Sequence, residues 1–163
     1  MKIRDAIEAD LSAIVEIYNA AVPSRIATGD TKPVTVESRR AWFYDHSPSM
    51  RPLWVMEAEE IIIAWLSFNS FYGRPAYEQT AELSIYISPQ YRGRGMGQKL
   101  LQQAIEHSPR LGLKNLVAFI FAHNEASLRL FEKNRFQQWG YLPLVAELDG
   151  VERDLVILGL RVG

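Results

Sequence analysis

The sequence predicts a mixed α/β fold in which helices flank a central, mostly antiparallel sheet. Segments rich in strand-forming residues follow one another at residues 53–56, 61–68 and 81–87, and acidic residues separate the first two, as in a hairpin. Farther along the chain, apolar residues recur at helical spacing between two strand-like segments, which is typical of a strand–helix–strand crossover. Helical segments in both halves of the chain supply the layers that would cover such a sheet.

The N-terminal third is expected to contain one strand and two helices. Residues 2–4 fit a short strand, and Asp10 is the expected N-cap of the helix that follows. One face of that helix would carry Leu11, Ile14, Ile17 and Tyr18. Residues 23–33 mix Pro, Gly, Ser, Thr and Asp as loops do, and a helical pattern resumes at 36–44. The loop between these helices is a candidate wall of a substrate pocket.

The crossover is expected after the strand at 81–87. The helix at residues 98–106 would end at Gly112, ahead of an apolar strand at 116–121. The other expected elements are a helix at 124–134 and strands at 136–142 and 155–160, with a turn between them at Asp149-Gly150.

Composition narrows the range of functions. At 163 residues the chain has the size of one domain, so we expect residues 1–163 to form a single unit. A net charge of −1 gives no basic surface for nucleic acid or for an acidic membrane. The absence of cysteine excludes a thiolate nucleophile, and no histidines have metal-ligand spacing, so we expect no metal. The N-terminus has no signal-peptide pattern and the longest apolar run, 61–66, is short, so the expected location is cytoplasmic.

A glycine-rich turn carries the clearest functional signal. Gly93, Gly95 and Gly97 lie between the strand at 81–87 and the start of the next helix. A backbone with few side chains can wrap closely around an anion, and a helix N-terminus adds partial positive charge. Arg92 and Arg94 could add charge-assisted hydrogen bonds to a pyrophosphate or a ribose phosphate. The turn therefore predicts a cradle for a phosphorylated cofactor.

Three other interpretations compete for this turn. A dinucleotide fingerprint would need an acidic residue at the end of the next strand, but that strand is followed by Ala122-His123. A Walker-type loop needs Lys and then Ser or Thr after the last glycine, where this chain has Gln98. A purely structural glycine turn stays open, because glycine alone is a weak signal.

The turn and its flanks resemble the GNAT family of acetyl-CoA-dependent N-acetyltransferases. Arg92, Gly95 and Gly97 fill the family signature of Arg or Gln, two free positions, Gly, one free position, and Gly or Ala. Within the family, the chain is most similar to the phosphinothricin and methionine sulfoximine acetyltransferases. The matching segments are Ile17-Tyr18-Asn19, Arg39 with Trp42-Phe43, Arg74-Pro-Ala-Tyr77 with Thr80, and residues 82–87.

The resemblance implies an enzyme that moves the acetyl group of acetyl-CoA to the amine of a small amino-acid-like substrate. It also implies a homodimer. The cofactor contacts that it implies are Ile85, Tyr86, Ile87, Arg92, Gly93, Arg94, Gly95, Met96, Gly97, Gln98, Asn124 and Ser127. The substrate contacts that it implies are Arg74, Tyr77, Glu82 and Ser84.

Two catalytic roles follow from the resemblance. Glu82 would act as general base on the ammonium group, and the backbone N–H of Ile87 would donate to the thioester oxygen. Each assignment has a structural alternative, since a strand glutamate can be a cross-strand ion-pair partner and Arg74 can be a solvated loop arginine. Thr28 and Thr35 are weaker candidates for the same pocket.

One position departs from the family pattern. The residue that would protonate the departing thiolate is Phe131, which has no proton to donate, and Arg135 replaces a glycine in the same motif. Tyr86, His123, solvent or the substrate would then supply the proton. Two alternatives therefore remain open: a peptide, protein or polyamine acetyltransferase, and a weakly catalytic acyl-CoA-binding sensor.

Overall fold

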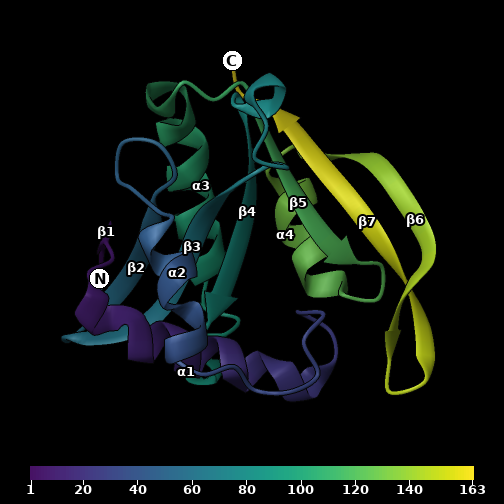
Figure 1. Ribbon diagram of the computed structural model, residues 1–163, viewed down its shortest axis with the longest axis horizontal. Coiled ribbons are helices and arrows are strands. Elements are labelled where there is room, and N and C mark those ends of the chain that lie inside the picture. The colour runs from purple at the N-terminus through teal and green to yellow at the C-terminus, as the bar shows by residue number, and fades with distance from the viewer.

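The computed structural model describes residues 1–163 and contains one seven-stranded sheet in the order β1-β2-β3-β4-β5-β7-β6. Every neighbouring pair is antiparallel except β4 and β5, which are parallel (Figure 1). The strands are β1 Lys2–Asp5, β2 Leu53–Ala58, β3 Ile61–Ser70, β4 Thr80–Ile87, β5 Asn115–Phe121, β6 Gln137–Leu148 and β7 Val151–Arg161. The predicted mixed, mostly antiparallel sheet with flanking helices is confirmed.

Helices cover both faces of the sheet. They are α1 Leu11–Ala21, α2 Arg40–Tyr44, α3 Met96–His107 and α4 Glu125–Lys133, with short 3-10 turns between elements. On one face, α1 buries Ile14 and Ile17 against Val55 and Trp65, and α2 packs its aromatic residues on the same cluster. On the opposite face, Leu100 and Leu101 of α3 belong to the larger core (Figure 1). None of the helices is long and apolar enough to cross a membrane.

Strands β4 and β5 separate along their length. Their pairing covers only Thr80 to Glu82 on β4, opposite residues 115–117 on β5. Figure 1 shows the two strands side by side near one end and spread apart toward the other. Strand β3 continues to pair with β4 as far as Ile87, so only the β5 side of β4 is left open. The gap is the feature that positions the functional site.

Several local predictions need correction. Asp10 directly precedes α1 but does not cap it, because its carboxylate accepts hydrogen bonds from the Arg4 guanidinium and the Ile7 amide. The Asp10 carboxylate is therefore engaged by Arg4 and is not available for the expected N-cap hydrogen bond. Helix α3 begins two residues before the predicted start, at Met96, because left-handed Gly95 serves as its N-cap. The turn between β6 and β7 lies at Asp149-Gly150 as predicted, although both strands extend beyond their predicted ends.

Candidate active site

A cavity of about 810 Å³ opens where β4 and β5 separate. Its walls come from the end of β4, the glycine turn, the first turn of α3, strand β5 and helix α4, and the loop after α1 closes one side. Of the residues expected to contact the cofactor, all except Arg94 line it. These are Ile85, Tyr86, Ile87, Arg92, Gly93, Gly95, Met96, Gly97, Gln98, Asn124 and Ser127.

The open edge of β4 directs backbone groups into this cavity. Alternate residues of an antiparallel pair turn their backbone groups toward the partner strand. The Ser88 amide donates to the Ile63 carbonyl of β3 at 2.8 Å, so the even-numbered residues of β4 turn their backbone groups toward β3. The backbone groups of Ile85 and Ile87 therefore face the gap on the β5 side. The Nε of Arg92 reaches the Ile87 carbonyl there, at 3.3 Å. The amide of Ile87 is therefore placed to donate to a ligand's carbonyl oxygen.

The glycine turn leaves a helix N-terminus accessible. Gly93 and Gly95 have φ of +74° and +82°, which side chains rarely permit, and no side chain caps α3 at Gly95. The first amides of α3 have no partner within the helix and can bind an anion. A β-carbon at Gly97 would lie 3.0 Å from the Leu130 side chain, so a glycine there lets α3 begin close against α4. These features fit a pyrophosphate.

Three cationic side chains line the same cavity. Arg92 borders it beside the turn, as expected, and Arg129 and Lys133 on α4 also border it. Arg94 does not line the cavity, because its guanidinium lies over the Tyr91 ring, 5.3 Å from the centroid. Nothing in the spacing of Arg129 and Lys133 marked them as site residues, because surface helices commonly carry such cations.

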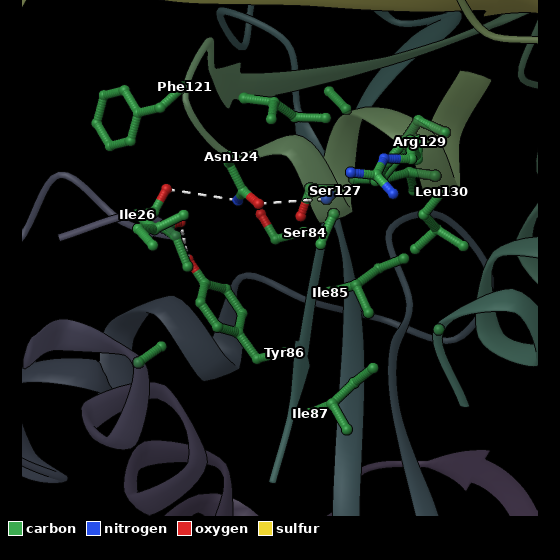
Figure 2. A pocket seen from close by; sticks show the side chains of 18 of the residues that line it. Ile26, Ser84, Ile85, Tyr86, Ile87, Phe121, Asn124, Ser127, Arg129 and Leu130 are labelled. Carbon is green, nitrogen blue, oxygen red and sulfur yellow. Dashed lines mark hydrogen bonds between the residues drawn. The ribbon is translucent and has the colours of Figure 1, made fainter. Parts of the chain in front are cut away.

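The loop after α1 is held against the cavity by hydrogen bonds to three successive carbonyls. His123 Nε2 donates to Arg25 at 2.9 Å, Asn124 Nδ2 to Ile26 at 3.4 Å and the Tyr86 hydroxyl to Ala27 at 3.2 Å. Figure 2 shows the contact of Asn124 with Ile26, together with the Ser127 amide donating to the Asn124 side chain. Asn124 therefore caps α4 as well as lining the cavity.

A second cavity of about 340 Å³ lies on the other face of the sheet, between β3, β4, α1 and α2. Its lining residues are Ile14, Val15, Tyr18, Val34, Arg39, Trp42, Trp65, Ser67, Asn69, Glu82, Ser84 and Tyr86. Glu82, Ser84 and Tyr86 line both cavities. Alternate positions of β4 thus form the boundary between a cofactor-sized cavity and a smaller one.

Glu82 lies at this boundary without a protein partner. Its carboxylate makes no hydrogen bond or ion pair, although its backbone carbonyl accepts from the Asn69 side chain at 3.3 Å. Burial raises the pKa of the Glu82 carboxyl, because desolvation disfavours the charged form. The cross-strand ion pair that was its alternative role is absent. A partly buried carboxylate with no partner is suited to accept a proton.

Three residues near the cavity are candidates for the proton donor to the departing thiolate. Phe131 lines the larger cavity and packs edge-on against Phe136, so it contributes only apolar surface. His123 does not line the cavity: its Nε2 is occupied by Arg25, and its Nδ1 is buried without a partner. Tyr86 borders both cavities, and burial raises the pKa of its phenol, which keeps it protonated. Tyr86 is the only one of the three that both lines the cavity and carries an exchangeable proton, which its hydroxyl donates in this structure to the Ala27 carbonyl at 3.2 Å.

Two of the four predicted substrate residues line the smaller cavity and two do not. Glu82 and Ser84 line the smaller cavity, whereas Arg74 and Tyr77 lie in the exposed segment before β4 and line neither cavity. Thr28 is buried and lines the larger cavity, and Thr35 is exposed. Arg39 and Trp42, which belong to the segments matching the family, also line the smaller cavity. Trp65 lines it as well and was not predicted, because nothing local in its strand marks it as a site residue.

Comparisons with known proteins agree with this geometry. Residues 13–136 match the Acetyltransferase (GNAT) family. A Bacillus subtilis protein provisionally named phosphinothricin acetyltransferase YwnH is 53% identical over 160 residues, 98% of each chain. An L-methionine sulfoximine/L-methionine sulfone acetyltransferase of Salmonella typhimurium is 33% identical over 162 residues, covering 99% of this chain and 95% of the relative.

A solved structure is similar throughout. The Sinorhizobium meliloti phosphinothricin acetyltransferase in complex with acetyl-CoA superposes with a TM-score of 0.93 at 28% identity, covering 99% of this chain and 88% of that one. The match to the family extends over more than half of the chain, including the glycine turn and both open strands. The chain belongs to the GNAT family of acetyltransferases.

Proposed function

We propose that this protein transfers the acetyl group of acetyl-CoA to the amine of a small amino-acid-like substrate, by direct attack. The observation that carries the proposal is the position of Glu82, an unpaired and partly buried carboxylate on the strand that separates the two cavities. The larger cavity accommodates the cofactor, and the smaller one presents the acceptor amine to it. The phosphinothricin and methionine sulfoximine acetyltransferases named among its relatives support this class of substrate.

The residues of the larger cavity suit acetyl-CoA. The α3 amides from Met96 to Gln98 and the Arg92 side chain would hold the pyrophosphate, and Asn124 and Ser127 would border the pantetheine arm. The open edge of β4 at Ile85 would bind the same arm through backbone groups. Bound there, acetyl-CoA supplies an acetyl group activated as a thioester.

The chain's own residues would then supply proton transfer and charge stabilisation. Glu82 accepts the proton of the acceptor's ammonium group and leaves a neutral amine, which is the nucleophilic form. The Ile87 amide donates to the carbonyl oxygen, where negative charge develops as the new C–N bond forms. Tyr86 is the proposed proton donor to the sulfur when the C–S bond breaks, in place of the family residue that Phe131 substitutes. The second proton that the acceptor nitrogen loses as the amide forms passes to solvent, and Tyr86 regains a proton from solvent.

We also propose a homodimer in the cytoplasm, where acetyl-CoA is available. Strand β6 is an edge of the sheet and exposes a row of apolar side chains, as an unpaired interface would. The row contains Trp139, Tyr141, Leu142, Leu144 and Val145. Sedimentation velocity of the wild type and of Leu144→Glu tests this, with a dimer expected for the first and a monomer for the second.

The proposed activity is tested by following free thiol release from acetyl-CoA. The acceptors would be L-methionine sulfoximine, phosphinothricin, L-methionine sulfone, common amino acids, a polyamine and a peptide. Turnover confined to the amino-acid-like acceptors supports the proposal. Turnover of the peptide or polyamine alone would refute it, and acetyl-CoA binding without turnover of any amine would indicate a sensor.

A further inference from the structure

The smaller cavity contains one cation and one carboxylate, Arg39 and Glu82. No other lysine, arginine, aspartate or glutamate lines it. The remaining polar groups there are the hydroxyls of Tyr18, Ser67, Ser84 and Tyr86 and the Asn69 amide, and the rest of the wall is apolar. A cavity with a single charge of each sign is complementary to a zwitterion.

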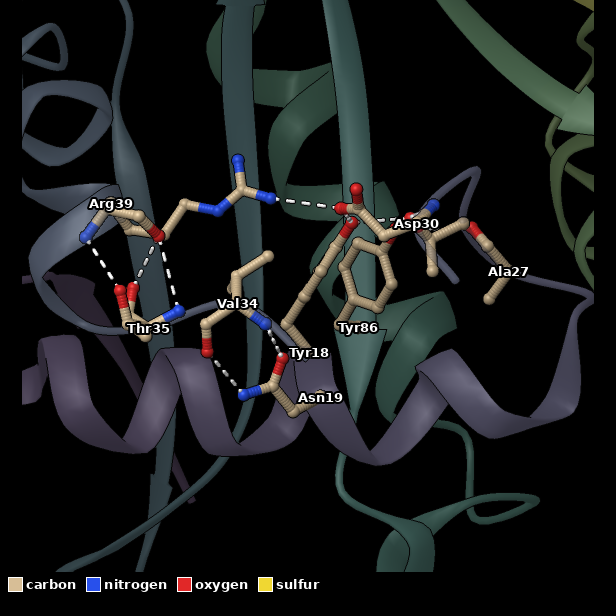
Figure 3. A network of polar contacts seen from close by, with 10 residues as sticks. Tyr18, Asn19, Ala27, Asp30, Val34, Thr35, Arg39 and Tyr86 are labelled. Atoms are coloured by element: carbon tan, nitrogen blue, oxygen red, sulfur yellow. Dashed lines mark hydrogen bonds and ion pairs between the residues drawn. The ribbon is translucent and has the colours of Figure 1, made fainter. Parts of the chain in front are cut away.

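Arg39 retains free hydrogen-bond donors. Its Nη2 contacts the Asp30 carboxylate at 3.1 Å, and its guanidinium lies over the Tyr18 ring, 5.1 Å from the centroid (Figure 3). Its Nε and Nη1 make no hydrogen bond. Asp30 and Tyr18 therefore orient the planar group and leave one edge free, and such an edge can bind a carboxylate through two parallel hydrogen bonds.

Aromatic side chains form part of the wall of the same cavity. Trp42 packs edge-on against Trp65, with ring centroids 5.5 Å apart, and the Trp65 indole N–H donates to the Ile14 carbonyl at 3.1 Å. Tyr86 stacks on the other side of Trp65 at 4.8 Å. These rings are fixed by packing and can bind an apolar side chain of modest size.

We propose that Arg39 binds the α-carboxylate of the acceptor and thereby selects free amino acids over amides, esters and peptides. This inference rests on the proposed function and assigns its acceptor subsite. The ammonium group of the acceptor faces Glu82 while its carboxylate faces Arg39. Arg74, the arginine expected from the sequence in this role, lies outside the cavity.

The test compares an acceptor with and without its carboxylate. L-methionine sulfone and its carboxamide are each assayed as acceptors with the wild type, Arg39→Gln, Arg39→Lys and the control Arg74→Gln. Loss of charge-assisted hydrogen bonds predicts a fall of about 10- to 100-fold in kcat/KM for the acid with Arg39→Gln. The carboxamide should change less than about threefold, and Arg39→Lys should recover part of the loss through its point charge. Arg74→Gln should match the wild type.

Comparison of the two acceptors also separates a role of Arg39 in carboxylate binding from a structural role in the loop. Equal losses for acid and carboxamide with Arg39→Gln would mean that Arg39 only anchors the loop through Asp30, and this would overturn the proposal. A selective loss with Arg74→Gln instead would move the subsite to the segment before β4. KM for acetyl-CoA and the thermal midpoint report any wider damage.

A binding measurement distinguishes this inference from the proposed activity. Isothermal titration of L-methionine sulfone into the protein with CoA present gives Kd without turnover. Binding by the wild type that weakens about 10- to 100-fold in Arg39→Gln supports the carboxylate site even if no acetyl transfer occurs. If the wild type binds neither the sulfone nor its carboxamide, the subsite assignment is wrong.

Discussion

The two cavities that meet at β4 differ in the chemical groups proposed to bind their ligands. In the larger one, the groups proposed to bind the cofactor include backbone groups of the open edge of β4, the glycine turn and the start of α3. The smaller one presents side chains from α1, α2, β3 and β4, including both of its charges. A backbone site suits a cofactor shared by many enzymes, whereas a side-chain site can be changed one residue at a time to accept another substrate.

The largest expected effect falls on Glu82, which belongs to both cavities. Removal of a general base predicts a loss of about 10²- to 10⁴-fold in kcat/KM for Glu82→Gln. Burial raises the pKa of this carboxyl, so wild-type activity should rise with pH as the carboxyl ionises, and the variant should lack that ascending limb. A pH profile of thiol release measures both. If Glu82→Gln keeps the ascending limb of the pH profile, another group is the general base.

The backbone character of the larger cavity is tested at Gly95. Alanine is strained at φ of +82° by about 1 to 2 kcal/mol, so Gly95→Ala should relax the cradle and raise the Kd of CoA about 5- to 30-fold. Gly150→Ala is the matched control, with φ of +80° in the β6–β7 turn and no contact with either cavity. It should lose comparable stability and keep wild-type affinity in a calorimetric titration. Equal affinities for the two variants would contradict the cradle.

A substitution at Tyr86 tests whether a side chain donates the proton to the departing thiolate of the cofactor. Tyr86→Phe keeps the stacking on Trp65 and removes only the hydroxyl. Because thiolates leave readily, loss of the proton donor should lower kcat only about 3- to 10-fold, with KM for acetyl-CoA unchanged. Steady-state kinetics with L-methionine sulfone measure this. An unchanged kcat would leave solvent or the substrate as the source of the proton.

The smallest effect concerns the stability cost of keeping Glu82 partly buried. Its pKa is higher in the folded than in the unfolded chain, so the folded state binds more protons between the two values and stability falls as pH rises through that window. Glu82→Gln should therefore unfold at a higher temperature than the wild type at pH 8. The difference should vanish below the unfolded pKa, near pH 4. Thermal melts followed by circular dichroism at both pH values decide this.

The fold was largely predictable because local patterns report element types. The hairpin of β2 and β3, the crossover through α3 and the turn at Asp149-Gly150 were all expected from periodicity and turn residues. Asp10 was assigned wrongly because the ion pair with Arg4 that occupies it joins two elements. The separation of β4 from β5 over residues 84–87 was expected from the family resemblance alone, because no local pattern in either strand indicates it.

The sequence by itself determined the family and the mixed sheet, and it predicted which segment would form the proposed cofactor cradle. A cradle made of backbone requires glycines at set spacing, and that requirement is visible in one short segment. Only the tertiary structure decided which side chains share the smaller cavity. Arg39, Trp42, Trp65 and Glu82 come from four elements, and their proximity depends on how α2 and the turn before it pack against β3 and β4. The same packing excluded Arg74 from the cavity, because charge and motif give a residue's chemistry but not the direction it faces.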